Sequence, residues 1–278
     1  MQSLIRSFIH SFIYMLNTYK RFWLFHWAEQ LQYRANTLMY LLYWLVSPIV
    51  YMAVWTAVSR ANGNVGGLTT NDFLSYYMVA LVVNILCSSI VIHILGPKIE
   101  DGTVAAWLLQ PVHPVLTYSL MSGITFKALQ ILAVIPIWAI LYMIYQPVFH
   151  LEWLNVLAGG VAVVLGFVIL FLHGCVMTFL AFWTTRIWAL FNVYIALYSL
   201  TSGEFVPLEL LPSTLQTIAW VLPYQLTLYF PTQLILGKIS MQAALPQFGL
   251  QIMWIVIFAV LFRWSWRKGL QQYSSVGA

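Results

Sequence analysis

Long apolar segments alternate with short polar ones along most of the chain. The apolar segments occupy residues 38–58, 73–95, 128–145, 153–183, 187–201 and 248–264. A helix needs roughly 20 mostly apolar residues to cross the hydrocarbon core of a membrane. We therefore expect six transmembrane helices, of which the fifth is short and the third starts near Val115. The expected fold is an all-α membrane protein.

The composition also indicates that a membrane is the main solvent. Hydrophobic residues make up 62% of the 278 residues and charged residues only 7%, whereas a soluble domain carries about 25% charged residues. Cys87 and Cys175 lie inside apolar segments without metal-ligand spacing, so we interpret them as small core residues. The net charge is +5. In a membrane protein such an excess of Lys and Arg usually lies in the cytoplasmic loops, so we expect no nucleic-acid partner.

The basic residues predict the orientation, because cytoplasmic loops carry an excess of Lys and Arg. With the N-terminus inside, two of the 12 basic residues, Arg60 and Lys238, lie outside, and Lys127 lies in the third span, able to snorkel inward. The nine cytoplasmic ones are Arg6, Lys20, Arg21, Arg34, Lys98, Arg186, Arg263, Arg267 and Lys268. We expect a multi-pass protein of the inner (cytoplasmic) membrane with both termini in the cytoplasm.

Residues 1–35 have the pattern of an amphipathic helix. Apolar residues recur at helical spacing over 3–17, and basic residues flank the stripe that follows. This second stripe consists of Tyr19, Trp23, Trp27 and Leu31. Aromatic rings beside basic side chains are typical of a helix at the headgroup level, so we expect an interfacial helix. The alternative is a stripe that packs on the protein's own spans.

The segment 203–236 is too polar and too often interrupted by proline to be a straight span. Its two apolar pieces, 215–222 and 225–230, are each too short to cross a bilayer. Non-helical backbone at membrane depth needs protein or a cavity around it. We therefore expect a re-entrant helical hairpin that enters from the outer side. Its defining residues are Gly203, Glu204, Pro207, Pro212, Pro223 and Pro231.

The segment 96–114 places polar residues, including two adjacent carboxylates, between the second and third spans. We expect Gly96 and Pro97 to break the second span and Thr103 to cap a short helix. Two later prolines would end that helix and start the third span. The apolar side of the helix would fit a groove on a soluble partner. The alternative is an ordinary capped turn lying on the membrane.

Chemical groups suited to catalysis are sparse. No P-loop, HExxH or G-x-S-x-G motif occurs, and His26 and Glu29 stand three apart without a second such pair. His173 in the fourth span could be a ligand or a proton relay, although a single intramembrane His more often bonds a neighbouring helix. Apart from Lys127, ionisable side chains cluster at span ends and loops. We expect no catalytic residue, metal site or cofactor in this chain, and energy from another subunit.

The chain resembles the permease subunits of ABC-2 type exporters, over essentially its whole length. The resemblance rests on six spans, an N-terminal interfacial helix, the lack of an ATP site and the order of Gly and Pro motifs after the fifth span. Those motif residues are Gly203, Pro207, Leu211, Pro212, Leu222, Pro223, Pro231, Leu236 and Gly237. The resemblance implies residues 36–268 as the transmembrane domain and 269–278 as a cytoplasmic tail. It also places this chain in a branch of small permeases often encoded as an unlike pair beside one ATPase.

The resemblance further implies that 96–114 holds a coupling helix docking in a separate ABC ATPase, which binds ATP and Mg²⁺. The implied docking residues are Lys98, Glu100, Asp101, Thr103, Trp107, Leu108 and Pro111. The implied partners are this ATPase, a second permease subunit, for which an unlike chain is favoured over an identical one, and membrane lipids.

A substrate path lined by the first, second and fifth spans also follows from the resemblance. Its candidate residues are Tyr40, Tyr43, Trp44, Tyr51, Tyr77, Asn84, Ser88, Asn192, Tyr194 and Tyr198. Aromatic walls suit an amphipathic, lipid-like or drug-like cargo. Two other functions stay open: a stand-alone channel or secondary carrier, and a lipid-modifying membrane enzyme using His173 and Lys127.

Overall fold

The computed structural model describes residues 2–110, 113–184 and 186–273. The protein is 82% helical and forms no strand within these ranges, which confirms the all-α class. The longer helices are α1 (Gln2–Gln32), α2 (Arg34–Asn62), α3 (Thr70–Cys87), α4 (Val91–Glu100), α6 (Met121–Tyr145), α7 (Trp153–Phe179), α8 (Ile187–Thr201) and α11 (Met241–Gln272). The shorter ones are α5 (Ala105–Leu108), the π-helix η1 (Val115–Leu120), η2 (Leu180–Phe182), η3 (Leu208–Leu210), α9 (Ser213–Val221), η4 (Tyr224–Leu226) and α10 (Tyr229–Ile235).

Five helical segments among the described residues are long and apolar enough to cross a membrane. They are α2, α3 with α4, η1 with α6, α7 with η2, and α11. The fifth expected span corresponds to α8, which has 15 residues. At 1.5 Å per residue α8 is about 22 Å long, whereas the hydrocarbon core is about 30 Å thick. The membrane class is therefore confirmed, and six crossings stay a prediction.

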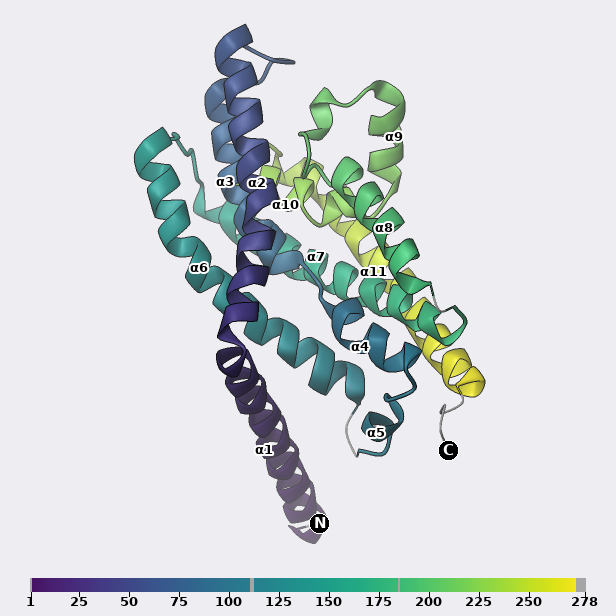
Figure 1. Cartoon of the computed structure of the whole chain (residues 1–278). Helices are drawn as coiled ribbons and strands as arrows, with labels where there is room; N and C mark the ends of the chain where they lie inside the picture. Colours follow the sequence, from purple (N-terminus) through teal and green to yellow (C-terminus); the bar gives the residue numbers. More distant parts are fainter. Residues whose placement is uncertain (1, 111–112, 185, 274–278) are drawn as a thin grey trace.

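The centre of the packing is α7, which lies against α3, α10 and α11 (Figure 1). Phe230 of α10 is fully buried in one cluster with Ile169 of α7 and Phe258 of α11. At Gly166 of α7 an added Cβ would lie only 3.1 Å from the Cα of Thr227. The absence of a side chain at Gly166 therefore lets the 223–236 part of the hairpin segment pack into the core of the bundle.

The two segments with predicted functions lie at opposite ends of the molecule. Figure 1 shows α5 near the end to which the N-terminal part of α1 points, and α9 near the end where α2 meets α3. This arrangement is compatible with the expected topology, in which 96–114 and 203–236 lie on different sides of the membrane.

The N-terminal segment forms one continuous helix, α1, as the amphipathic pattern predicts. Its C-terminal half contacts η1: His26 Nε2 lies 2.9 Å from the backbone oxygen of Thr117, and the rings of Phe22 and Tyr118 meet edge to face. This part of α1 therefore packs on the protein itself, as the alternative interpretation expects. Its position relative to the membrane surface stays a prediction.

Candidate functional site

The second long helical segment is broken at residues 88–90. α3 ends at Cys87, and Ser88 has extended backbone angles (φ −53°, ψ 153°). Two carbonyls at this helix end accept hydrogen bonds from side chains. The Ser88 hydroxyl donates to the oxygen of Ile85 at 2.9 Å, and the Lys127 ammonium donates to the oxygen of Leu86 at 2.7 Å. A cation at a helix C-terminus also complements the helix dipole.

The second span was predicted to break at Gly96 and Pro97, and this prediction was wrong. The observed break lies earlier, at residues 88–90. Gly96 and Pro97 lie inside α4, which continues to Glu100. A proline removes one intrahelical hydrogen bond but does not end a helix that packing holds in place. Leu95 and Ile99 on either side of these residues are buried in a cluster with parts of α7 and α11, and this packing stabilises α4.

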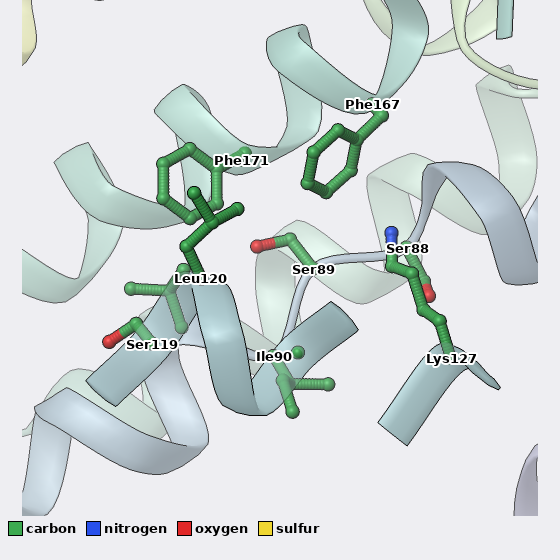
Figure 2. Close-up of a pocket in the computed structure, with 10 residues that line it drawn as sticks. Ser88, Ser89, Ile90, Ser119, Leu120, Lys127, Phe167 and Phe171 are labelled. Carbon is green, nitrogen blue, oxygen red and sulfur yellow. The ribbon is translucent and has the colours of Figure 1, made fainter. Parts of the chain in front are cut away.

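Lys127, which we expected to be able to snorkel inward, directs its ammonium at the neighbouring helices α3 and α7. Its ammonium lies 3.9 Å from the ring centroid of Phe167 and makes the contact with Leu86 described above. Figure 2 shows this amine beside Ser88 at the edge of a small cavity, with the Ser89 hydroxyl pointing toward the two phenylalanine rings of α7. The space open to water in this cavity is about 10 Å³, roughly one water molecule. The break is thus a small polar site within apolar helices.

The 96–114 loop, which we expect to be cytoplasmic and to couple to a partner, contains a single helical turn, α5. Its N-cap is Val104, whose N–H donates to the carbonyl of Lys98. The expected cap, Thr103, donates both its N–H and its hydroxyl to the Asp101 carboxylate instead, so the capping prediction was wrong. Asp101 competes successfully because a short acidic side chain readily accepts from the residue two positions later. The Thr103 hydrogen bonds hold the pKa of the Asp101 carboxyl below its usual range, so this exposed residue is anionic at neutral pH.

Stacked aromatic rings fix the position of α5. Trp107 stacks on Tyr118 of η1, with ring centroids 4.0 Å apart and planes 6° from parallel. The Tyr118 hydroxyl donates to Gln110 Oε1 at 2.8 Å, and Phe22 of α1 contacts the same ring. Trp107 and Leu108 are therefore half-buried. Trp107 holds the loop in place rather than offering a fully open surface.

Other residues complete the loop. Tyr273, next to the end of α11, donates its hydroxyl to the carbonyl of Gly102, which has a positive φ of 75°. Leu109 projects outward with 88% of its surface exposed. Lys98 and Glu100 are half-buried, and Pro111 lies outside the described residues. The loop is thus tied to η1, which itself contacts α1, and to the end of α11, while it presents Asp101 and Leu109.

The prolines of the 203–236 segment lie at or near helix starts. Pro207, Pro212 and Pro223 directly precede η3, α9 and η4, where a missing N–H costs no intrahelical bond. Pro231 lies in the first turn of α10. The apolar piece 215–222 thus forms most of α9, which is largely exposed, and the piece 225–230 spans η4 and the start of α10, which are buried. This is the geometry of a broken, inward-packed hairpin.

Glu204 lies at the start of this hairpin and reaches two other helices. Its Oε1 accepts from Asn84 Nδ2 of α3 at 3.1 Å, and its Oε2 accepts from the Ser199 hydroxyl of α8 at 2.8 Å. Gly203, with φ 88°, allows the sharp turn that places it there. The Tyr76 hydroxyl approaches so closely that it would meet a Cβ at Gly203 at 2.5 Å. The turn therefore requires glycine at this position.

The predicted path residues fall into two groups. Tyr51, Tyr77, Asn84, Tyr194 and Tyr198 surround the 202–205 loop or lie within one aromatic cluster beside it. Tyr40, Tyr43 and Asn192 are exposed on the outer surfaces of α2 and α8, and Ser88 lies at the helix break. The side chain of Trp44 lies outside the described part of the structure. The structure thus gathers about half of the predicted set around Glu204.

The two singled-out histidines have protein partners. His173 lies 3.5 Å from the Tyr224 hydroxyl and packs among Tyr194 and Phe258. His26 lies between the Glu29 carboxylate and the Thr117 carbonyl. Within the described ranges no three His, Cys, Asp or Glu side chains come together as a metal site. Both histidines therefore have geometries typical of helix-to-helix contacts.

Two functional contacts went unrecognised in the sequence: Glu204 with Asn84, and Tyr118 between α1 and α5. The first joins residues 120 apart, and no local spacing indicates it. The available signal in the sequence is that Glu204 is the sole carboxylate in the SGEF stretch between apolar helices. Tyr118 had no distinguishing signal, because its role depends on how α1 folds back against η1.

Comparison with protein families gives a match over most of the chain. Residues 35–277 match a family model described as ABC-2 family transporter protein. Comparison with curated proteins gives no match.

Proposed function

Because the chain belongs to the ABC-2 transporter family, we propose that it is the transmembrane permease subunit of an ATP-driven exporter. Proteins of this family are generally non-catalytic transport components that work with an ABC ATPase. The family match carries the proposal. The long apolar helices and the lack of a P-loop in the sequence agree with it. The subunit spans the inner membrane six times, α8 providing the fifth crossing, with both termini cytoplasmic.

The 96–114 loop is the docking site for the ATPase in this proposal. Three features support this role: an exposed leucine directly after α5, an anionic Asp101 in the same loop, and contacts with η1 and with Tyr273 at the end of α11 that can transmit force. Nucleotide binding closes the ATPases, and their motion reaches the spans through α4 and η1. ATP supplies the differential affinity that moves the equilibrium between inward-facing and outward-facing states.

A second permease, unlike this one or identical to it, completes the transport path. The exposed apolar surfaces of α2 and α8 are available to this second subunit and to lipid. The cargo is amphipathic, lipid-like or drug-like, because tyrosine and phenylalanine rings line the hairpin entrance. The cargo leaves from the cytoplasm or inner leaflet past the 203–236 hairpin.

Copurification tests the proposal. The tagged chain, solubilised in detergent from its native cells, should carry a P-loop ATPase with it. The triple variant Glu100→Ala, Asp101→Ala and Trp107→Ala should lose that subunit at an unchanged yield of permease. A matched double variant, Glu152→Ala with Trp153→Ala, removes an acid and an exposed tryptophan outside the loop and should retain it. An ATPase bound equally by both variants would contradict the docking site.

A further inference from the structure

Glu204 is a fixed carboxylate at the junction of three helices. Its own contacts join α3 and α8, and its neighbour Phe205 joins α2. The carbonyl of Phe205 accepts from Trp55 Nε1 at 2.9 Å and from the Tyr77 hydroxyl at 3.0 Å. The carbonyl of Gly203 accepts from the Tyr76 hydroxyl at 2.7 Å. The loop is therefore held on both sides of Glu204, and its carboxylate position is set before any ligand arrives.

Within the described residues no protein cation pairs with the Glu204 carboxylate. Its hydrogen-bond donors are an amide and a hydroxyl, which are neutral. The ion pairs found within the described ranges join His26 to Glu29 and Lys238 to Asp72, and neither involves Glu204. An unpaired charge among apolar helices is costly, and such residues usually serve ligands or ions. The arrangement therefore favours a bound positive charge.

Aromatic rings lie near this carboxylate. Tyr51 meets Phe205 edge to face at 5.4 Å, and Tyr194 and Tyr198 lie 6.0 Å apart on the adjacent face of α8. The face of an aromatic ring attracts cations and also packs on apolar groups. Phe205 is 45% exposed, so a ligand from the α2 side can reach the loop. An inorganic metal ion fits poorly, because one carboxylate among rings lacks the six or more oxygens that a hard cation takes.

We propose that Glu204, with the rings of Tyr51 and Phe205, recognises the positive charge of an organic cation with an apolar or aromatic body. This inference rests on the proposed export function, because it names the chemical class of the exported cargo. The carboxylate binds the charge, and the rings bind the body of the cargo.

Equilibrium binding to the purified chain tests the proposal with two ions of the same shape. Tetraphenylphosphonium is a cation, and tetraphenylborate is an anion of nearly equal size. Wild type should bind the phosphonium at least tenfold more tightly than the borate. Glu204→Gln, which keeps the size and an acceptor oxygen, should weaken phosphonium binding about 10–100-fold, a range consistent with a charge pair near a protein surface. Glu209→Gln should leave it unchanged, because Glu209 already pairs with Tyr229 and Gln233.

A second variant protects the test against misfolding. Phe205→Leu leaves the backbone carbonyl that Trp55 and Tyr77 contact, and should weaken phosphonium binding several-fold through the lost ring. Equal binding of both ions to wild type, or unchanged phosphonium affinity in Glu204→Gln, would overturn the proposal. Because this assay contains no ATPase, its failure is distinguishable from failure of ATPase copurification.

Discussion

Leu109 offers the sharpest single-residue test of where the ATPase docks. It directly follows α5 and is 88% exposed, the highest value among the large hydrophobic side chains of the described residues. It makes little contact with the rest of the protein, so Leu109→Ser should leave folding intact. A soluble partner that covers this loop would bury almost the whole side chain.

The expected loss of affinity follows from that burial. Transferring a leucine side chain from water to an apolar surface contributes about 1.5–3 kcal/mol. A change of 1.4 kcal/mol corresponds to a tenfold change in Kd. Leu109→Ser should therefore weaken binding of the ATPase by about 10–100-fold.

Titration of the detergent-solubilised permease with purified ATPase measures this change directly. Leu151→Ser is the matched control, because Leu151 is 52% exposed in the loop between α6 and α7, away from α5 (Figure 1). The control should bind the ATPase like wild type. Equal affinities of wild type and Leu109→Ser would refute the assignment of this loop as the docking surface.

Two further variants test the packing that supports the site. Tyr118→Leu removes the stack with Trp107 and should reduce ATPase binding, whereas Tyr118→Phe keeps the ring and should bind normally; equal loss in both would show that the stack is not the cause. Gly166→Ala places a methyl group against the 223–236 segment and should lower the unfolding temperature, since overpacking costs about 1–3 kcal/mol. Gly160→Ala, where the new Cβ would meet no atom within 4 Å beyond its own stretch of helix, should not lower it, and a similar fall in both would contradict the close-approach argument.

The helices themselves could be predicted from the sequence because apolar residues and prolines act locally. The pattern indicated the long helices, although it gave α3 and α4 as one span, and Pro207, Pro212 and Pro223 lie directly before helix starts. The pattern did not indicate the break at residues 88–90. That break depends on Ser88 and on Lys127. The Lys127 ammonium bonds the carbonyl of Leu86, which is 41 residues away in the chain.

The candidate site was only partly predictable for the same reason. Asn84, Glu204 and four of the tyrosines could be selected by residue type, but their convergence depends on how α3, α8 and the hairpin pack together. Likewise Trp107 looked like an open contact, because its stack on Tyr118 is a tertiary contact. Contacts between residues distant in the chain carry no spacing that a single sequence reveals.

The central claim is that this polypeptide forms a passive gate driven by a separate ATPase. Reconstituted vesicles can hold the permeases alone, the ATPase alone, the full complex, or the complex with its P-loop lysine replaced. ATP-dependent accumulation of a fluorescent amphipathic dye should occur only with the intact complex. Accumulation driven by the permease chains without the ATPase would contradict the claim.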